Sequence, residues 1–497
     1  MHRIALSCSL ACSLACSVTA PLAAFQGNGK IPITTRSDEA RALFVRARAL
    51  NETLTAHEAH VLFVRTIALD PSFAMAEYYL ASTAPTARER AEHLQKAVVL
   101  AANVSPGERL VILGLEARNH ADRARSLTLA ESLVVLYPRD ERVHSGLAIL
   151  YGGQQRYAKA IVEYQKAIDI NPEYSLAYNQ LGYANRSVGN MAAAEAAFRQ
   201  YIAHMPNDPN PYDSYAELLM KTGRFDESIV QYRKALSHDP HFGASYIGIA
   251  ANEMFAGRHS AALAELDAYY AAARDASERR AALFNRAMID VDRGMPDMAL
   301  QAMERSYALA GASGDTVSMA ADGIATADIL LEAKRVDAAH DRYRQAHDLV
   351  AGSTLSAEVR ADDALARHYD LARVGLAQHD PKTAIAEATT YMIGATARKN
   401  DVRVRQAHEL NGLVALHDLK FSESLAELSQ ADQENPAVVY AMASAYAGKG
   451  DTAKAKELSE RAVHMNILPT LPYVFTRAAV AASNRSATSG TAPGKPR

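Results

Sequence analysis

Tryptophan is absent from this chain of 497 residues, and its three cysteines all lie within the first sixteen positions. If Cys8, Cys12 and Cys16 leave with a cleaved leader, the mature chain has no disulfide, no thiolate nucleophile and no cysteine-based metal site. The chain also has no large excess of positive or negative charge, because it contains 53 basic and 56 acidic residues. A dedicated nucleic-acid binder carries a strongly basic surface, so we expect no nucleic-acid partner.

Long hydrophobic runs are missing after the first two dozen residues. Residues 4–22 carry no charge, follow a weakly positive start, and lead into small residues before Phe25. This pattern is typical of a secretory signal peptide over residues 1–24 and predicts a periplasmic or secreted protein. Two alternatives stay open: the segment is retained as an N-terminal anchor, or the chain is lipid-anchored through Cys16, because residues 13–16 resemble a bacterial lipobox with Ser13 at the usual leucine position. We expect no transmembrane segment after the signal peptide.

Proline recurs every 34 residues, at Pro138, Pro172, Pro206 and Pro240. Small, aromatic and turn residues recur at the same interval of 34. The small-residue series are Gly114, Ala148, Gly182, Ala216 and Ala250, and Ser126, Ala160, Ala194, Ser228 and Ala262; the aromatic series is Tyr164, Phe198 and Tyr232; the turn series is Gly189, Gly223 and Gly257. Small residues allow two helices to approach closely, while glycine and proline end the first and second helix of a unit. The period therefore predicts stacked helical hairpins, since one hairpin cannot bury its apolar face alone.

The 34-residue unit resembles the tetratricopeptide repeat. Tyr178, Leu181-Gly182, Ala194, Phe198 and Pro206 carry most of its pattern, with Tyr where the family often has Trp. The unit before it carries Leu147-Ala148, Tyr151, Ala160, Tyr164, Ala167 and Pro172. The resemblance implies an all-α fold: a right-handed α-solenoid of about 12 helix–turn–helix repeats with a C-terminal capping helix.

The repeats divide the chain into segments. We expect a loose N-terminus over 25–36, an N-terminal half of the solenoid over 37–274 with regular units from about 106, and a less regular C-terminal half over 275–467. Residues 468–482 are expected to form the capping helix. The tail 483–497 is rich in Ser, Thr, Gly and Pro, which predicts disorder.

In such a solenoid the first helix of each unit lines a concave groove, which usually holds a peptide or a partner helix. The register of the two most regular units gives nine candidate groove residues that combine amide, phenol and both signs of charge: Asn179, Gln180, Tyr183, Arg186, Asn210, Asp213, Ser214, Glu217 and Lys221. Amides match the donors and acceptors of a peptide backbone, and an arginine pairs with carboxylates. The alternative is an ordinary solvated helix face.

The sequence offers few candidate residues for catalysis or metal binding. His340, His347, His368 and His379 are scattered without acidic residues at metal-ligand spacing, and Asp322, Asp328, Asp362 and Asp363 form no calcium loop. The basic stretches 360–373 and 398–405 are interrupted by Asp and are interpreted as solvated faces.

No catalytic residue, cofactor or metal site is therefore predicted. We expect a non-catalytic scaffold of the bacterial envelope that binds a protein or peptide, with an envelope enzyme or an enzyme's accessory subunit as the alternative. An enzyme should concentrate ionisable groups with shifted pKa values in one pocket, whereas a scaffold should show a shallow channel without such a cluster.

Overall fold

The computed structural model describes residues 29–488 except 54–55, 85–86, 121 and 399. The expected signal peptide, and residues 489–497 of the expected disordered tail, lie outside the described residues. Within the described part the secondary structure is helical, without strands. Helices α1–α24 form twelve consecutive hairpins, and α25 follows them. The expectation of an all-α solenoid of about 12 repeats is confirmed.

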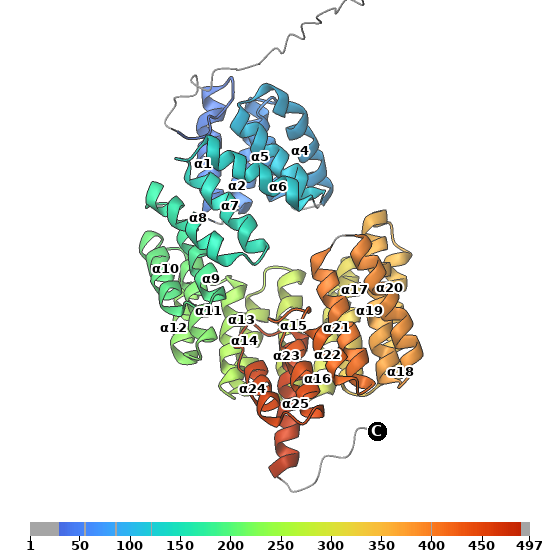
Figure 1. The fold of residues 1–497 in the computed structure, drawn as a ribbon. Helices are drawn as coiled ribbons and strands as arrows, with labels where there is room; N and C mark the ends of the chain where they lie inside the picture. Colours follow the sequence, from blue (N-terminus) through green and yellow to red (C-terminus); the bar gives the residue numbers. More distant parts are fainter. Residues whose placement is uncertain (1–28, 54–55, 85–86, 121, 399, 489–497) are drawn as a thin grey trace, which may run out of the picture. The chain divides into compact units, whose positions relative to one another are not determined.

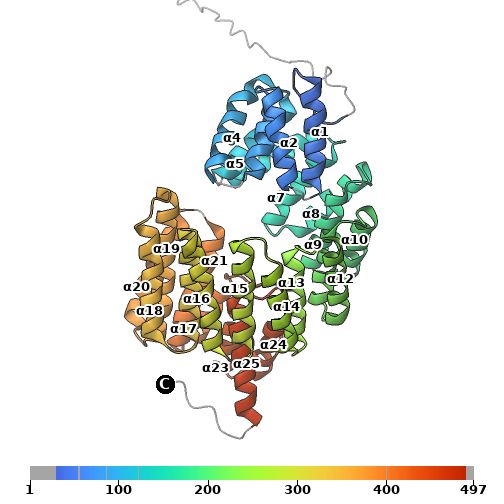
Figure 2. The ribbon, with the colours of Figure 1, turned by 180° about the vertical axis from the view of Figure 1, so that it is seen from behind.

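The chain divides into two compact units, residues 1–177 and 178–497. The first contains α1 (Asp38–Glu52), α2 (Ala56–Leu69), α3 (Ala74–Thr83), α4 (Ala87–Leu100), the short η2 (Ala101–Asn103), α5 (Pro106–Asn119), α6 (Arg123–Leu136), α7 (Glu141–Gly153) and α8 (Tyr157–Ile170). Successive helices of this unit pack as neighbours, as Figure 2 shows for α1 and α2.

The boundary between the units falls within α9 (Ser175–Ser187). The second unit continues with α10 (Met191–His204), α11 (Pro209–Lys221), α12 (Phe225–His238), α13 (Gly243–Phe255), α14 (His259–Ala272), α15 (Ala276–Asp292), α16 (Pro296–Ala312), α17 (Thr316–Glu332) and α18 (Val336–Ala351). It ends with α19 (Ala357–Ala377), α20 (Pro381–Ala397), α21 (Asp401–His417), α22 (Phe421–Leu428), α23 (Pro436–Gly448), α24 (Thr452–Val463) and α25 (Leu471–Thr488).

The periodic residues form the helix ends that the sequence predicts. Each of α6, α8, α10 and α12 ends two residues before a proline of the 34-residue series. The turn glycines Gly189, Gly223 and Gly257 have φ of 79°, 76° and 75°. Side chains disfavour this left-handed conformation, so glycine at this position ends the first helix of a unit without strain.

Close packing explains some of the small residues at the other fixed position. A Cβ added to Gly182 would lie 2.6 Å from Phe198 on the second helix of the same hairpin. Gly248 lies two residues before Ala250 of this series and is packed as closely, because a Cβ there would lie 2.1 Å from Tyr232 Cζ on α12. The absent side chain lets α9 and α10 touch within one hairpin at Gly182, and lets α12 and α13 touch between two hairpins at Gly248. By contrast, a Cβ on Gly114, in the same register as Gly182, would meet nothing within 4 Å.

The C-terminal helices return to the middle of the second unit. Helix α25 packs on α15, α17, α23 and α24, and Figure 1 shows it beside α23 and α24. The rings of Phe255 and Tyr473 lie 5.7 Å apart, and Arg477 Nε donates to Asp292 Oδ1 over 2.7 Å. Leu471 and Val474 join the same apolar cluster as Leu283 of α15 and Ile329 of α17. The contact between Phe255 and Tyr473 joins residues from both sides of the division that we expected at 274/275, and both residues belong to the second compact unit.

The two ends of the described chain differ from the expected loose segments. Residues 29–36 have no regular secondary structure but are held by hydrogen bonds of the first unit, and α25 continues to Thr488 where we expected the tail to begin at 483. Among the described residues, none of the helices is both long enough and apolar enough to span a membrane.

Candidate functional site

The candidate groove residues lie on α9 and α11 and bond to one another. Tyr183 Oη donates to Ser214 Oγ over 3.2 Å, and Tyr201 Oη donates to Asn210 Oδ1 over 3.1 Å. Ser214 Oγ also lies 3.5 Å from Asn210 Oδ1. The structure therefore brings these residues together, as the register predicts, but their polar atoms join neighbouring repeats to each other.

The charged candidates are paired in the same way. Arg186 Nη1 lies 3.0 Å from Glu217 Oε2, and its guanidinium lies 4.7 Å from the centre of the Tyr183 ring. Both charged side chains are half-buried. A partner that uses either charge must therefore compete with an existing ion pair.

Three of the candidates, Asn179, Asp213 and Ser214, are buried inside the repeats. Asp213 is 6% exposed and accepts a hydrogen bond of 2.7 Å from Ser245 Oγ on α13. Burial raises the pKa of Asp213 to about 7, against the lowering effect of that hydrogen bond. Asn179 is 3% exposed, and its Oδ1 has no hydrogen-bond partner among the described residues. Gln180, the remaining candidate on α9, is half-buried.

The chain's own C-terminal segment reaches the end of α11. Lys221 Nζ donates to the carbonyl oxygen of Met465 over 2.7 Å. Burial, and after it the nearby Arg186, lower the pKa of Lys221. Of the nine candidates, Lys221 is thus in contact with a polypeptide segment, but that segment belongs to this chain.

A second surface, which the sequence did not single out, lies in the C-terminal half of the second unit. A cavity of about 660 Å³ is lined by residues of α17, α19, α21, α23 and α25. Known ligand sites of proteins have volumes of about 300–1,000 Å³. The first helix of each hairpin supplies most of the wall, as the solenoid geometry predicts for an inner surface.

The cavity contains a network of buried charges. His347, which is 3% exposed, lies 3.0 Å from Asp363 through Nδ1 and 3.0 Å from Asp370 through Nε2. Burial alone would lower the pKa of His347, but the two carboxylates raise it to about 9, so the imidazolium is bound between them at neutral pH. Arg373 pairs with Asp328, which also accepts a hydrogen bond from Tyr343 Oη.

Glu409 has a different environment within the same cavity. It is 9% exposed, and its carboxylate accepts only long hydrogen bonds, of 3.5 and 3.4 Å, from Asn435 Nδ2. Burial raises the pKa of Glu409 to about 7, although Arg373 acts in the opposite direction. Glu409 therefore changes its charge near neutral pH.

The serine and threonine hydroxyls that line the cavity donate to carbonyls of their own helices. Ser444 Oγ donates to the carbonyl of Tyr440, and Thr476 Oγ1 donates to that of Pro472. Neither hydroxyl is hydrogen-bonded to a base, which is the arrangement that activates a nucleophile. Across the described part of the chain, no three His, Cys, Asp or Glu side chains are grouped so that they could hold a metal ion.

The sequence analysis named some of these cavity residues but did not predict that they lie together. His347 was interpreted as one of four scattered histidines without acidic residues at metal-ligand spacing, and Asp328 and Asp363 as residues that form no calcium loop. The carboxylates that bond to His347 lie 16 and 23 positions away from it in the sequence. The stretches 360–373 and 398–405 supply Arg373 and Arg403 to the cavity wall and are not wholly solvated faces. Alternation of Arg and Asp in both stretches was the available signal.

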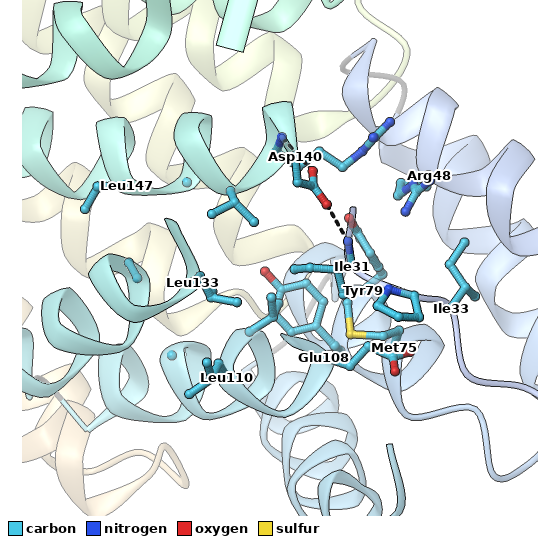
Figure 3. A pocket seen from close by; sticks show the side chains of 18 of the residues that line it. Ile31, Ile33, Arg48, Met75, Tyr79, Glu108, Leu110, Leu133, Asp140 and Leu147 are labelled. Carbon is cyan, nitrogen blue, oxygen red and sulfur yellow. Dashed lines mark hydrogen bonds between the residues drawn. The ribbon is translucent and has the colours of Figure 1, made fainter. Parts of the chain in front are cut away.

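The first unit contains a smaller cavity of about 160 Å³, whose wall includes Ile31, Pro32 and Ile33 of the segment before α1. Ile31 N donates to Asp140 Oδ2 over 2.9 Å, and Thr34 N donates to Glu108 Oε1 over 2.7 Å. Figure 3 shows Asp140 and Ile31 joined by the first of these bonds. The carboxylates at the starts of α5 and α7 thus hold the segment before α1 by its backbone N–H groups.

The family comparisons match the most regular repeats. Residues 150–189 match a model described as TPR repeat, and residues 176–203 and 210–242 match one described as tetratricopeptide repeat. No curated protein matches the chain. The matched residues include all nine candidates of α9 and α11.

Similar solved structures are also tetratricopeptide repeat proteins. One from Parabacteroides merdae is 15% identical, with 55% of this chain and 94% of that chain covered and a TM-score of 0.34. A thermophilic protein from Thermus thermophilus is 21% identical, with 43% and 98% covered and a TM-score of 0.29. YrrB, whose title describes an unusual peptide-binding site, is 14% identical, with 41% and 89% covered and a TM-score of 0.27.

Proposed function

Because residues 150–203 and 210–242 carry tetratricopeptide repeats, we propose that this protein is a non-catalytic scaffold that binds a protein or peptide partner. Its main binding surface is the cavity lined by α17, α19, α21, α23 and α25. The observation that carries this proposal is the cavity itself: about 660 Å³ of space on the inner face of the hairpins, with polar and aromatic walls. The residues of α9 and α11 are a second proposed surface, where Gln180, Tyr183 and Arg186 are half-buried.

One observation favours the alternative, an enzyme or the accessory subunit of one. Groups with shifted pKa values gather in this cavity, as expected for a catalytic pocket: His347, Asp370 and Glu409 all have raised pKa values. Binding accounts for the site better, because His347 and Asp370 are bonded to each other and the hydroxyls of Ser444 and Thr476 are bonded to backbone carbonyls.

Site-specific photo-crosslinking in cells tests the binding surface. A photoreactive amino acid is placed in turn at Ala366 and Ser444, which line the cavity, and at Gln180 on α9. Glu423, exposed on α22, is the control position. We expect one discrete crosslinked partner from the two cavity positions and none from Glu423. A partner crosslinked from Gln180 alone would indicate that the main binding surface lies on α9 and α11. Crosslinking from Glu423 as strong as from the cavity positions would contradict the proposal.

We further propose that the protein acts in the cell envelope, as a periplasmic or secreted protein. The apolar first segment and the small residues before Phe25 support this. Mass spectrometry of the purified native protein tests it: Phe25 as the first residue is expected for cleavage, whereas a lipid on Cys16 indicates the anchored alternative. A cytoplasmic protein that retains Met1 would contradict the proposal.

A further inference from the structure

The charges that line the C-terminal cavity do not balance. Five carboxylates line it, those of Asp328, Glu332, Asp363, Asp370 and Glu409, against the three cationic side chains of His347, Arg373 and Arg403. Two of the cations are bound to carboxylates of the wall, His347 to Asp363 and Asp370, and Arg373 to Asp328. The third, Arg403, pairs with Asp362, which is not part of the wall. The cavity is therefore acidic when its groups are ionised.

After these ion pairs are formed, Glu409 is the buried carboxylate of the wall that has no cationic partner. Among the described residues Glu409 forms no ion pair; Arg373, which acts on its charge from further away, pairs with Asp328 instead, and Asn435 supplies its only hydrogen bonds, at 3.4 and 3.5 Å. A buried carboxylate without a counter-ion is costly, and a ligand cation would remove that cost. Glu332, the other carboxylate of the wall without an ion pair, is exposed, so water solvates its charge and no counter-ion is required.

Aromatic rings form part of the same wall. Tyr369, Tyr440 and Phe475 are partly exposed there, and Tyr391 packs behind Tyr369 with ring centres 5.5 Å apart. Glu409 is close enough to Tyr369 to raise the pKa of its phenol, after the larger effect of burial. Aromatic faces attract organic cations, and a carboxylate supplies the opposite charge. Rings and an unpaired carboxylate in one cavity are complementary to an ammonium group on an apolar stem.

We propose that this cavity receives the alkylammonium group of a lysine side chain from the partner polypeptide, with Glu409 as its counter-ion. The inference rests on the proposed function and names the chemistry that its binding surface selects. Lysine fits the two features together, because its four-carbon stem packs on tyrosine rings while its ammonium group reaches a buried carboxylate.

The proposed contact requires ionised Glu409, so lysine binding strengthens as pH rises through the pKa of Glu409. The groups that face Glu409 are Arg373 and Tyr369 of α19 and, from the segment before α23, Asp432 and Asn435. Arg373 stays cationic, and burial raises the pKa of Tyr369 well above the physiological range, so neither changes charge between pH 6 and pH 8. The affinity for lysine should therefore rise about tenfold over this interval.

The test uses the full chain and two matched pairs of probes, observed by saturation-transfer NMR of the ligand. The first pair is n-butylammonium and the neutral n-butanol. The second is the blocked pentapeptide Gly-Gly-Lys-Gly-Gly and its norleucine analogue, which lacks only the charge. Each is titrated at pH 6 and pH 8 against the unaltered protein, Glu409→Gln, and the control Glu423→Gln on the exposed face of α22.

We expect the cationic member of each pair to bind, more tightly at pH 8, with about tenfold to hundredfold loss in Glu409→Gln and no loss in Glu423→Gln. Equal binding of the neutral probes, or unchanged binding by Glu409→Gln, would overturn the inference. Binding of n-butylammonium without the lysine peptide would also overturn it, because the ligand would then be a free amine. If photo-crosslinking captures a partner at Ala366 and Ser444 while both cationic probes fail, the proposed function stands and the lysine inference alone is wrong.

Discussion

Asp213 was expected to face a partner, and its burial leads to a prediction about stability. Its carboxyl is 6% exposed, and its pKa is raised from 3.8 to about 7. A raised pKa means that the folded protein binds a proton that the unfolded chain releases between pH 4 and pH 7. Stability is therefore lost as pH rises through this interval. Replacing Asp213 with Asn removes the ionisable group but keeps an oxygen that can accept from Ser245.

The size of the effect follows from the shift. Three pKa units correspond to about 4 kcal/mol of cost for the charged form once both states are ionised, at 1.36 kcal/mol per unit. About a third of this cost is already present at pH 5, because the unfolded carboxyl is ionised there. The stability of Asp213→Asn relative to the unaltered protein should thus increase by about 3 kcal/mol between pH 5 and pH 8.

Hydrogen exchange measured by mass spectrometry over α11–α13 can detect this change locally. A stacked repeat array does not unfold in one step, so the opening free energy of these helices is more informative than a global melting temperature. The variant and the unaltered protein are compared at the same pH, so that intrinsic exchange rates cancel. Asp226→Asn, at an exposed position on α12, is the control. Its difference in opening free energy from the unaltered protein should be the same at pH 5 and pH 8. A difference between Asp213→Asn and the unaltered protein that is equal at pH 5 and pH 8 would refute the reasoning.

Three further predictions concern backbone and packing. Leu419 has a φ of 59° at the turn position that Gly450 occupies in the next hairpin. Leu419→Gly should therefore raise the opening free energy of α21–α22, measured by hydrogen exchange, by about 1 kcal/mol, and a decrease would contradict this. Gly248→Ala should lower stability by about 1–3 kcal/mol because its Cβ meets Tyr232, whereas Gly114→Ala should raise it by about 0.5–1 kcal/mol; equal effects would show that close packing does not select Gly248. Glu108→Ala should speed hydrogen exchange of residues 31–36 about tenfold or more, because Thr34 N loses its acceptor, and unchanged protection would mean that other contacts hold the segment.

The sequence predicted much of the fold because each repeat is a local structure. Proline, glycine and small-residue positions act within one hairpin, so their spacing alone indicates where helices end and where they touch. The regular units of α7–α12 follow this pattern, with first helices that begin at residues 141, 175 and 209. From α15 onwards the helices vary from 8 to 21 residues, so the period weakens and the register of inward-facing positions is lost.

The candidate site could be predicted only in part. The register placed Tyr183, Arg186 and Glu217 near one another, but it could not show that they bond among themselves, because each pair joins residues 31 positions apart. Likewise, the two carboxylates that hold His347 come from the following helix, and Glu409 lies in the next hairpin.

The sequence by itself determined the helical hairpin, its length of 34 residues and the stacking of about twelve such units, since these depend on interactions between near neighbours in the chain. Tertiary structure alone decided that α25 packs back on α15 and α17, that Lys221 contacts Met465, and that a cavity with an unpaired Glu409 forms in the C-terminal half. These features arise where residues up to 244 positions apart meet, and burial there changes charges that the sequence shows only as ordinary polar positions.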